Sequence, residues 1–69
     1  MFMFEAEEIR AIRKALDLNT TEFATRLGVT ENCVRRWELG DRTPRKEHMR
    51  TLNDLDKEAK ARAARELVA

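Results

Sequence analysis

The sequence predicts an all-α fold, a compact bundle of four or five helices. Apolar residues recur at intervals of three and four along most of the 69 residues, which is the period of an amphipathic helix. Two glycines and one proline are the only strong helix breakers, and no stretch alternates apolar and polar residues as a half-exposed strand does. We expect residues 1–69 to form a single domain, with a core over about 5–55 and a helical tail over 56–69.

The first helix is predicted from about Glu5 to Leu16. Acidic residues fill its first turn, where the helix dipole favours negative charge. Ile9, Ile12 and Leu16 follow one another at the spacing of a single helix face. This face is therefore expected to pack against the core.

A second helix is predicted to begin after Asn19. Asn19 and Glu22 have the spacing of a capping box, and Gly28 is suited to the positive φ of a helix C-terminus. Ala24 lies on the buried face, either because a small residue lets a neighbouring helix approach closely or because alanine simply favours a helix. The expected buried face consists of Phe23, Ala24 and Leu27.

A third helix is predicted between Thr30, as its N-cap, and Gly40, as its end. At about 100° per residue, Val34, Trp37 and Glu38 fall on one arc of this helix. Val34 and Trp37 are the expected core anchors, and we expect Trp37 to be structural. The opposite, outward arc carries Asn32, Arg35 and Arg36.

A fourth helix is predicted to begin with Thr43 as its N-cap and Pro44 at its first position. The remainder of the chain forms either one long helix or two helices with a break near Asn53-Asp54. The apolar stripe thins toward the C-terminus. It consists of Met49, Leu52 and Leu55, followed by Ala59, Ala63 and Leu67.

The composition excludes several kinds of site. The lone Cys33 excludes a disulfide within the chain, and one cysteine with one histidine, His48, does not supply the ligands of a zinc site. Cys33 is interpreted as a small filler rather than a redox switch, and His48 as a surface residue. The sequence has no nucleophile–base pair and no phosphate-binding glycine loop, so we expect no enzymatic activity, metal or cofactor. The apolar stretch Met1–Phe4 is too short for a signal peptide or membrane span, and a cytoplasmic protein is expected.

Positive charge is concentrated in the middle of the chain. The net charge is only +1, but residues 35–46 contain five basic and two acidic side chains. The first 19 residues are net acidic, with three basic and four acidic side chains. Such polarisation favours an electrostatic contact between residues 35–46 and a polyanion.

The third helix is therefore predicted to read DNA. A short helix with Asn and Arg on its outward face fits the major groove, because Asn pairs with adenine and Arg with guanine through two hydrogen bonds. Asn32 and Arg36 are the best candidates, and Arg35 contacts either a base or a phosphate. The cations Arg45 and Lys46, at a helix N-terminus, form a candidate phosphate site.

With these elements in place, the chain resembles the phage-repressor and Cro family of helix-turn-helix regulators, also called XRE-like. The resemblance covers roughly residues 5–55 and implies that the third helix lies in the major groove and that dimers bind two half-sites. It also implies a partly buried ion pair between Arg13 and Glu38. The matching residues are Ile9, Ile12-Arg13, Leu16, Leu18, Glu22-Phe23-Ala24, Leu27-Gly28-Val29, Val34, Arg36-Trp37-Glu38, Gly40 and Pro44.

The chain departs from the family pattern at three positions of this surface. Thr20 stands where the family often has a DNA-contacting Gln. Glu31 opens the third helix and is expected to accept from a cytosine amino group. Leu39 contacts either a thymine methyl or a dimer partner. The expected base contacts are Thr20, Glu31, Asn32, Arg35 and Arg36, and the expected phosphate contacts are Thr21, Thr30, Arg42, Thr43, Arg45 and Lys46.

The expected partners are double-stranded DNA and a second copy of the chain. The dimer surface is assigned either to Met1–Phe4 or to the tail around Leu67 and Val68. Both segments have an alternative interpretation, which is local packing onto the first helix. The competing function is a protein-interaction module, such as an antitoxin-like protein that binds a partner through its C-terminal helix.

Overall fold

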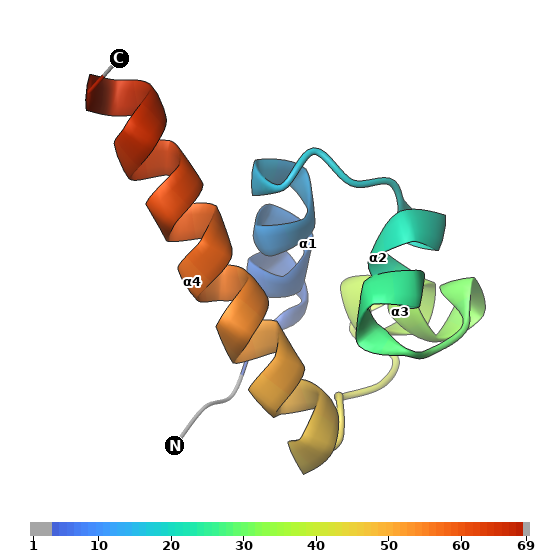
Figure 1. Ribbon diagram of the computed structural model, residues 1–69. Coiled ribbons are helices and arrows are strands. Elements are labelled where there is room, and N and C mark those ends of the chain that lie inside the picture. Colours follow the sequence, from blue (N-terminus) through green and yellow to red (C-terminus); the bar gives the residue numbers. More distant parts are fainter. Residues whose placement is uncertain (1–3, 69) are drawn as a thin grey trace.

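The computed structural model describes residues 4–68, with the side chains of residues 4–66. Within this range the chain forms four helices: α1 (Ala6–Ala15), α2 (Thr20–Leu27), α3 (Glu31–Leu39) and α4 (Lys46–Val68). Figure 1 shows α4 along one side of α1, with α2 and α3 on the other side. α3 packs against both α2 and α1, and α4 packs mainly against α1. The all-α prediction is confirmed, with four helices in the described residues.

The ends of α2 and α3 lie where the capping residues predict. The Asn19 carboxamide oxygen accepts from the Glu22 amide at 2.8 Å, and the Glu22 carboxylate accepts from the Asn19 amide at 3.0 Å. The Thr30 hydroxyl accepts from a backbone amide of the first turn of α3. Gly28 and Gly40 end the two helices with φ values of 72° and 83°, a region that strongly favours glycine.

The predicted start of the fourth helix is wrong by two residues. Thr43 and Pro44 lie outside the helix, which begins at Lys46. The Arg45 carbonyl accepts from the amides of His48 and Met49, both at 2.9 Å, and so occupies the N-cap position. Pro44 is instead buried in the bundle, a tertiary environment that a local start signal does not include. No break occurs near Asn53-Asp54, and α4 is one continuous helix of 23 residues.

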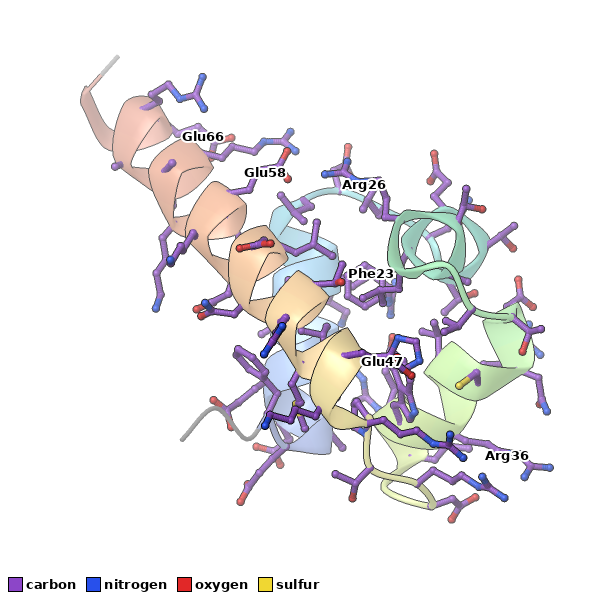
Figure 2. The ribbon with its side chains drawn as sticks, turned by 60° about the horizontal axis from the view of Figure 1, so that its bottom comes forward. Phe23, Arg26, Arg36, Glu47, Glu58 and Glu66 are labelled. Carbon is purple, nitrogen blue, oxygen red and sulfur yellow. The ribbon has the colours of Figure 1, made fainter. Side chains whose placement is uncertain are left out.

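All four helices contribute to one hydrophobic core. Trp37 is 3% exposed, which confirms its predicted place in the core. Figure 2 shows Phe23, which is fully buried, between α2 and α4. His48 is less exposed than expected, because its ring packs at 5.5 Å from that of Trp37. The core residues are Ile9, Ile12, Leu16, Phe23, Ala24, Leu27, Val34, Trp37, Met49, Leu52, Leu55 and Ala59.

The two ends of the described chain differ in how they meet this core. Phe4 packs against it in part, whereas Met1–Met3 lie outside the described residues. In α4 the core ends at Ala59, and residues 60–66 are exposed. The side chains of Leu67 and Val68 lie outside the described set. No helix of the described part has the length and apolar character to cross a membrane.

Candidate nucleic-acid interface

The outward face of α3 is positioned by burial of its inward face. Val34 and Trp37 are buried, and the helix has no room to rotate without exposing them. Asn32, Arg35 and Arg36 are consequently exposed on the other side. In Figure 2, Arg36 points away from the bundle. This face therefore presents one amide and two guanidinium groups on a fixed helix.

An ion pair ties the C-terminal end of α3 to α1. Arg13 Nε lies 2.8 Å from Glu38 Oε2, and Arg13 Nη2 donates to Glu38 Oε1 at 3.0 Å. The Arg13 Nη1 also donates to the Leu18 carbonyl at 3.1 Å. The pair is well shielded, since the Glu38 side chain is 7% exposed and that of Arg13 17%. This two-point contact between planar groups fixes the orientation of α3 as well as its distance from α1.

Sequence reasoning missed the part played by Arg10. Its Nη2 donates to the Glu38 backbone carbonyl at 3.0 Å, and its Nε lies 3.6 Å from the Glu38 carboxylate. Arg10 and Arg13 are three residues apart, and this spacing places both side chains on one face of α1. That spacing was the available signal for a second arginine at this seam.

The N-terminal end of α3 carries a different polar cluster. The Glu31 carboxylate accepts a hydrogen bond from the Thr21 hydroxyl of α2, and its other oxygen lies 2.8 Å from Arg35 Nη2. The Thr21 hydrogen bond lowers the pKa of Glu31 below its ordinary value, with further lowering by the Arg35 charge and a Thr20 hydrogen bond. Four of the expected DNA contacts are therefore engaged with one another.

Asn32 and Arg36 differ from this cluster. In the described part of the chain, neither side chain makes a hydrogen bond or an ion pair. Both side chains are exposed. Their donors and acceptors are therefore available to an external ligand without loss of an internal contact.

A second group of expected contacts lies at the start of α4. Arg42, Thr43, Arg45 and Lys46 are all exposed. Arg45 and Lys46 line a shallow depression together with Glu47 and Arg50. Arg50 was not among the expected phosphate contacts, although it lies one turn after Lys46. The Thr30 hydroxyl, expected at a phosphate, already accepts from the Cys33 amide.

Cys33 is half-buried and packs against the core. Among the described residues, no three His, Cys, Asp or Glu side chains lie close enough together to bind a metal ion.

Comparison with known proteins identifies the family. A family model described as helix-turn-helix, of the Cro/C1 type, matches residues 9–58, which is well over half of the chain. No curated protein and no solved structure matches the chain. The matched range contains α2, α3 and the α1–α3 ion pair, and a domain of this family implies DNA binding. The chain therefore belongs to the Cro/C1-type, XRE-like helix-turn-helix family.

Proposed function

We propose that the protein is a transcriptional regulator that binds specific double-stranded DNA sites with α3 in the major groove. One observation carries the proposal. Asn32 and Arg36 are exposed and have no internal partner among the described residues, on a helix whose opposite face is anchored by Val34 and Trp37. A rigid helix with such side chains places base-pairing groups at fixed positions in the groove.

Asn32 and Arg36 are the base-reading residues of this proposal. Asn pairs through two hydrogen bonds with adenine, and Arg does so with guanine, each giving about 1–3 kcal/mol of discrimination. The phosphate contacts are supplied by the exposed cations before α4 and in its first two turns, namely Arg42, Arg45, Lys46 and Arg50. Such contacts fix the position of the protein on the duplex but do not read sequence.

The proposal includes binding as a two-fold dimer. Two base readers give at most about 6 kcal/mol of discrimination and typically less. Specific and non-specific binding differ by roughly 4–10 kcal/mol in proteins of this kind. Two copies on half-sites about one helical turn apart double the number of reading side chains. Leu39, which is 71% exposed at the end of α3, is one apolar side chain that a second copy can cover.

A base reader and a phosphate contact give different results when they are removed. Sites are first selected from a random duplex pool, and affinities for a selected and a random duplex are then measured over a range of salt. Arg45→Ala is expected to weaken binding to both duplexes by the same factor and to flatten the slope of log K against log salt by about 0.9. Arg36→Ala is expected to erode discrimination at particular base pairs.

Arg62→Ala is the matched control, because Arg62 is an exposed arginine on the distal part of α4. It is expected to change neither affinity nor the salt slope. Equal loss of affinity of Arg36→Ala for the selected and random duplexes would remove its base-reading role. If no duplex is bound above background and the protein instead co-purifies tightly with another protein, the DNA proposal fails in favour of a protein-interaction module.

Sedimentation of the protein with and without its selected site tests the dimer. Two copies on a palindromic site are expected. A 1:1 complex on a non-palindromic site would contradict the dimer. Deletion of residues 1–4 then tests one candidate surface, since dimerisation that survives the deletion excludes that segment.

A further inference from the structure

Glu31 presents a carboxylate on the surface that is proposed to face DNA. It is the first residue of α3, where the positive end of the helix dipole favours a negative charge. A hydroxyl from α2 and a guanidinium from the next turn of α3 occupy its two oxygens. An anion so placed repels phosphates, yet donors within the protein bind both of its oxygens.

We propose that Glu31 removes Arg35 from the set of DNA contacts, by binding its guanidinium in a pair that persists on the DNA. This proposal rests on the proposed function, and it identifies Arg35 as an exposed arginine of α3 that does not contact the DNA. The Arg35 Nη2 lies 2.8 Å from Glu31 Oε1, at the i, i+4 spacing that α-helices favour for opposite charges. The pair is neutral, so Arg35 adds no net positive charge to the interface.

The position of Glu31 explains why a DNA phosphate does not replace it as the partner of Arg35. The Thr21 hydroxyl of α2 donates to the second carboxylate oxygen, so the side chain is anchored from a neighbouring helix as well as from its own. The Thr21 hydrogen bond lowers the pKa of Glu31 further below neutral pH, where a glutamate is ionised even at its ordinary pKa. Moving Arg35 to a phosphate leaves the Glu31 charge uncompensated beside a polyanion. Retention of the pair avoids that repulsion.

Two consequences follow for recognition. Sequence-independent affinity is lower than the number of exposed arginines indicates, because Arg35 neutralises a carboxylate rather than a phosphate. The base pair that faces Arg35 is not read, so the α3 surface reads through Asn32 and Arg36. Glu31 is in this sense a specificity-determining residue, although it does not touch a base.

Four proteins test the proposal: the wild type, Glu31→Gln, Arg35→Ala and the double variant. Arg35→Ala alone leaves the Glu31 charge without its partner beside the DNA, so it is expected to weaken binding to selected and random duplexes by the same factor. Glu31→Gln keeps the side-chain shape and releases Arg35, and it is expected to steepen the slope by about 0.9. Its gain in random-duplex affinity is therefore expected to shrink about 3.5-fold between 50 and 200 mM salt. The double variant is expected to have the random-duplex affinity and the salt slope of the wild type.

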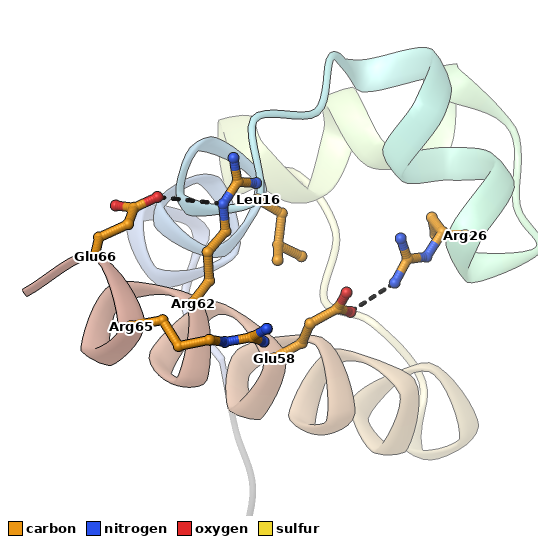
Figure 3. A pocket seen from close by; sticks show the side chains of 6 residues that line it. All are labelled: Leu16, Arg26, Glu58, Arg62, Arg65 and Glu66. Carbon is orange, nitrogen blue, oxygen red and sulfur yellow. Dashed lines mark hydrogen bonds and ion pairs between the residues drawn. The ribbon is translucent and has the colours of Figure 1, made fainter. Parts of the chain in front are cut away.

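Glu66→Gln is the matched control. Glu66 forms an i, i+4 pair with Arg62 on the distal part of α4, at 3.4 Å (Figure 3). In Figure 2, Glu66 lies at the opposite end of the molecule from Arg36. The same change in charge at this position is expected to leave the salt slope unaltered.

Site selection provides a second measurement. Sites selected with Glu31→Gln are expected to gain a guanine preference, at one base pair per half-site, that sites selected with the wild type lack. A gain in affinity that persists in the double variant, or a salt slope that is lower in the double variant than in the wild type, would overturn the proposal while leaving the proposed function intact. A wild type that binds no duplex would overturn both.

Discussion

Glu31 and Glu38 lie about two turns apart on α3, and each carboxylate binds an arginine guanidinium. The Glu38–Arg13 pair joins two helices through two contacts and is nearly shielded from water. The Glu31–Arg35 pair lies within one helix through a single contact, with side chains 35% and 62% exposed. Similar chemistry at the two ends of one helix therefore has different consequences, and the degree of burial decides between them.

The difference follows from the dielectric around each pair. Near the surface, water screens both charges, and an exposed ion pair adds little to folding stability. In the bundle, loss of one partner leaves the other charge buried without compensation, which is costly. The C-terminal end of α3, with Glu38, is thus expected to govern folding. The N-terminal end, with Glu31, is expected to govern only what the folded protein binds.

The largest effect is expected on the inward face itself. Trp37→Ala removes the largest side chain of the core, and such substitutions typically cost about 3–5 kcal/mol. This is a large share of the stability of so small a domain. Circular dichroism is expected to show a largely unfolded protein at 25 °C. Leu39→Ala changes an exposed position of the same helix, and this variant is expected to be as stable as the wild type.

A folded Trp37→Ala protein that has lost only DNA binding would contradict the division of α3 into a structural face and a DNA-binding face. It would place a residue of the inward face in the reading surface.

The two carboxylates give the most direct test. Glu38→Gln is expected to lower the free energy of unfolding by about 3 kcal/mol, the lower end of the range for a buried pair, because Arg13 keeps some contact with water. Glu31→Gln, the same change on the same helix, is expected to leave the denaturation midpoint within experimental error. Both are measured by urea unfolding followed through the fluorescence of Trp37, the sole tryptophan. Equal midpoints for the two variants would show that burial does not separate the two ends.

A smaller loss of stability than at Trp37 or Glu38 is expected at Gly28 and Gly40, which end α2 and α3. A Cβ added at Gly28 or Gly40 meets no atom within 4 Å, so the cost of alanine is that of the left-handed backbone alone. This cost is about 1–2 kcal/mol at each position. Denaturation midpoints of Gly28→Ala and Gly40→Ala are therefore expected to agree. A much larger loss of stability at Gly40 would mean that the position of the C-terminal end of α3 depends on the turn after the helix as well as on Glu38.

Much of the fold could be predicted from local chemistry. The limits of α2 and α3 follow from capping residues and glycines, because these signals act within one turn of the chain. The start of α4 could not be predicted in this way, since Pro44 is buried, and burial is not part of a local start signal. Whether α4 continues past Asn53 also depends on its packing against α1, which no local pattern contains.

The sequence predicts which side chains of α3 are exposed, but it does not predict the contacts that these side chains make within the protein. Periodicity separates the inward from the outward arc of α3. It does not reveal that Thr21 and Glu31, ten positions apart, meet across the turn between α2 and α3. The i, i+4 spacing of Glu31 and Arg35 is visible in the sequence, but it does not show whether the two side chains bind each other or DNA. The contact between Arg26 and Glu58, at 2.6 Å, joins residues 32 positions apart and had no signal in the sequence (Figure 3).

The continuity of α4 has a practical consequence. One unbroken helix connects Leu52, which is fully buried, with the exposed turns of residues 60–66. The helix is about 34 Å long, close to the longest dimension of the molecule, 37 Å. A spin label or fluorophore at Ala64 is thus attached through a stiff rod to the core, far from α3. Its tumbling reports the rotation of the whole domain, and distances between two such labels report the geometry of an assembly without disturbing the surface that is proposed to bind DNA.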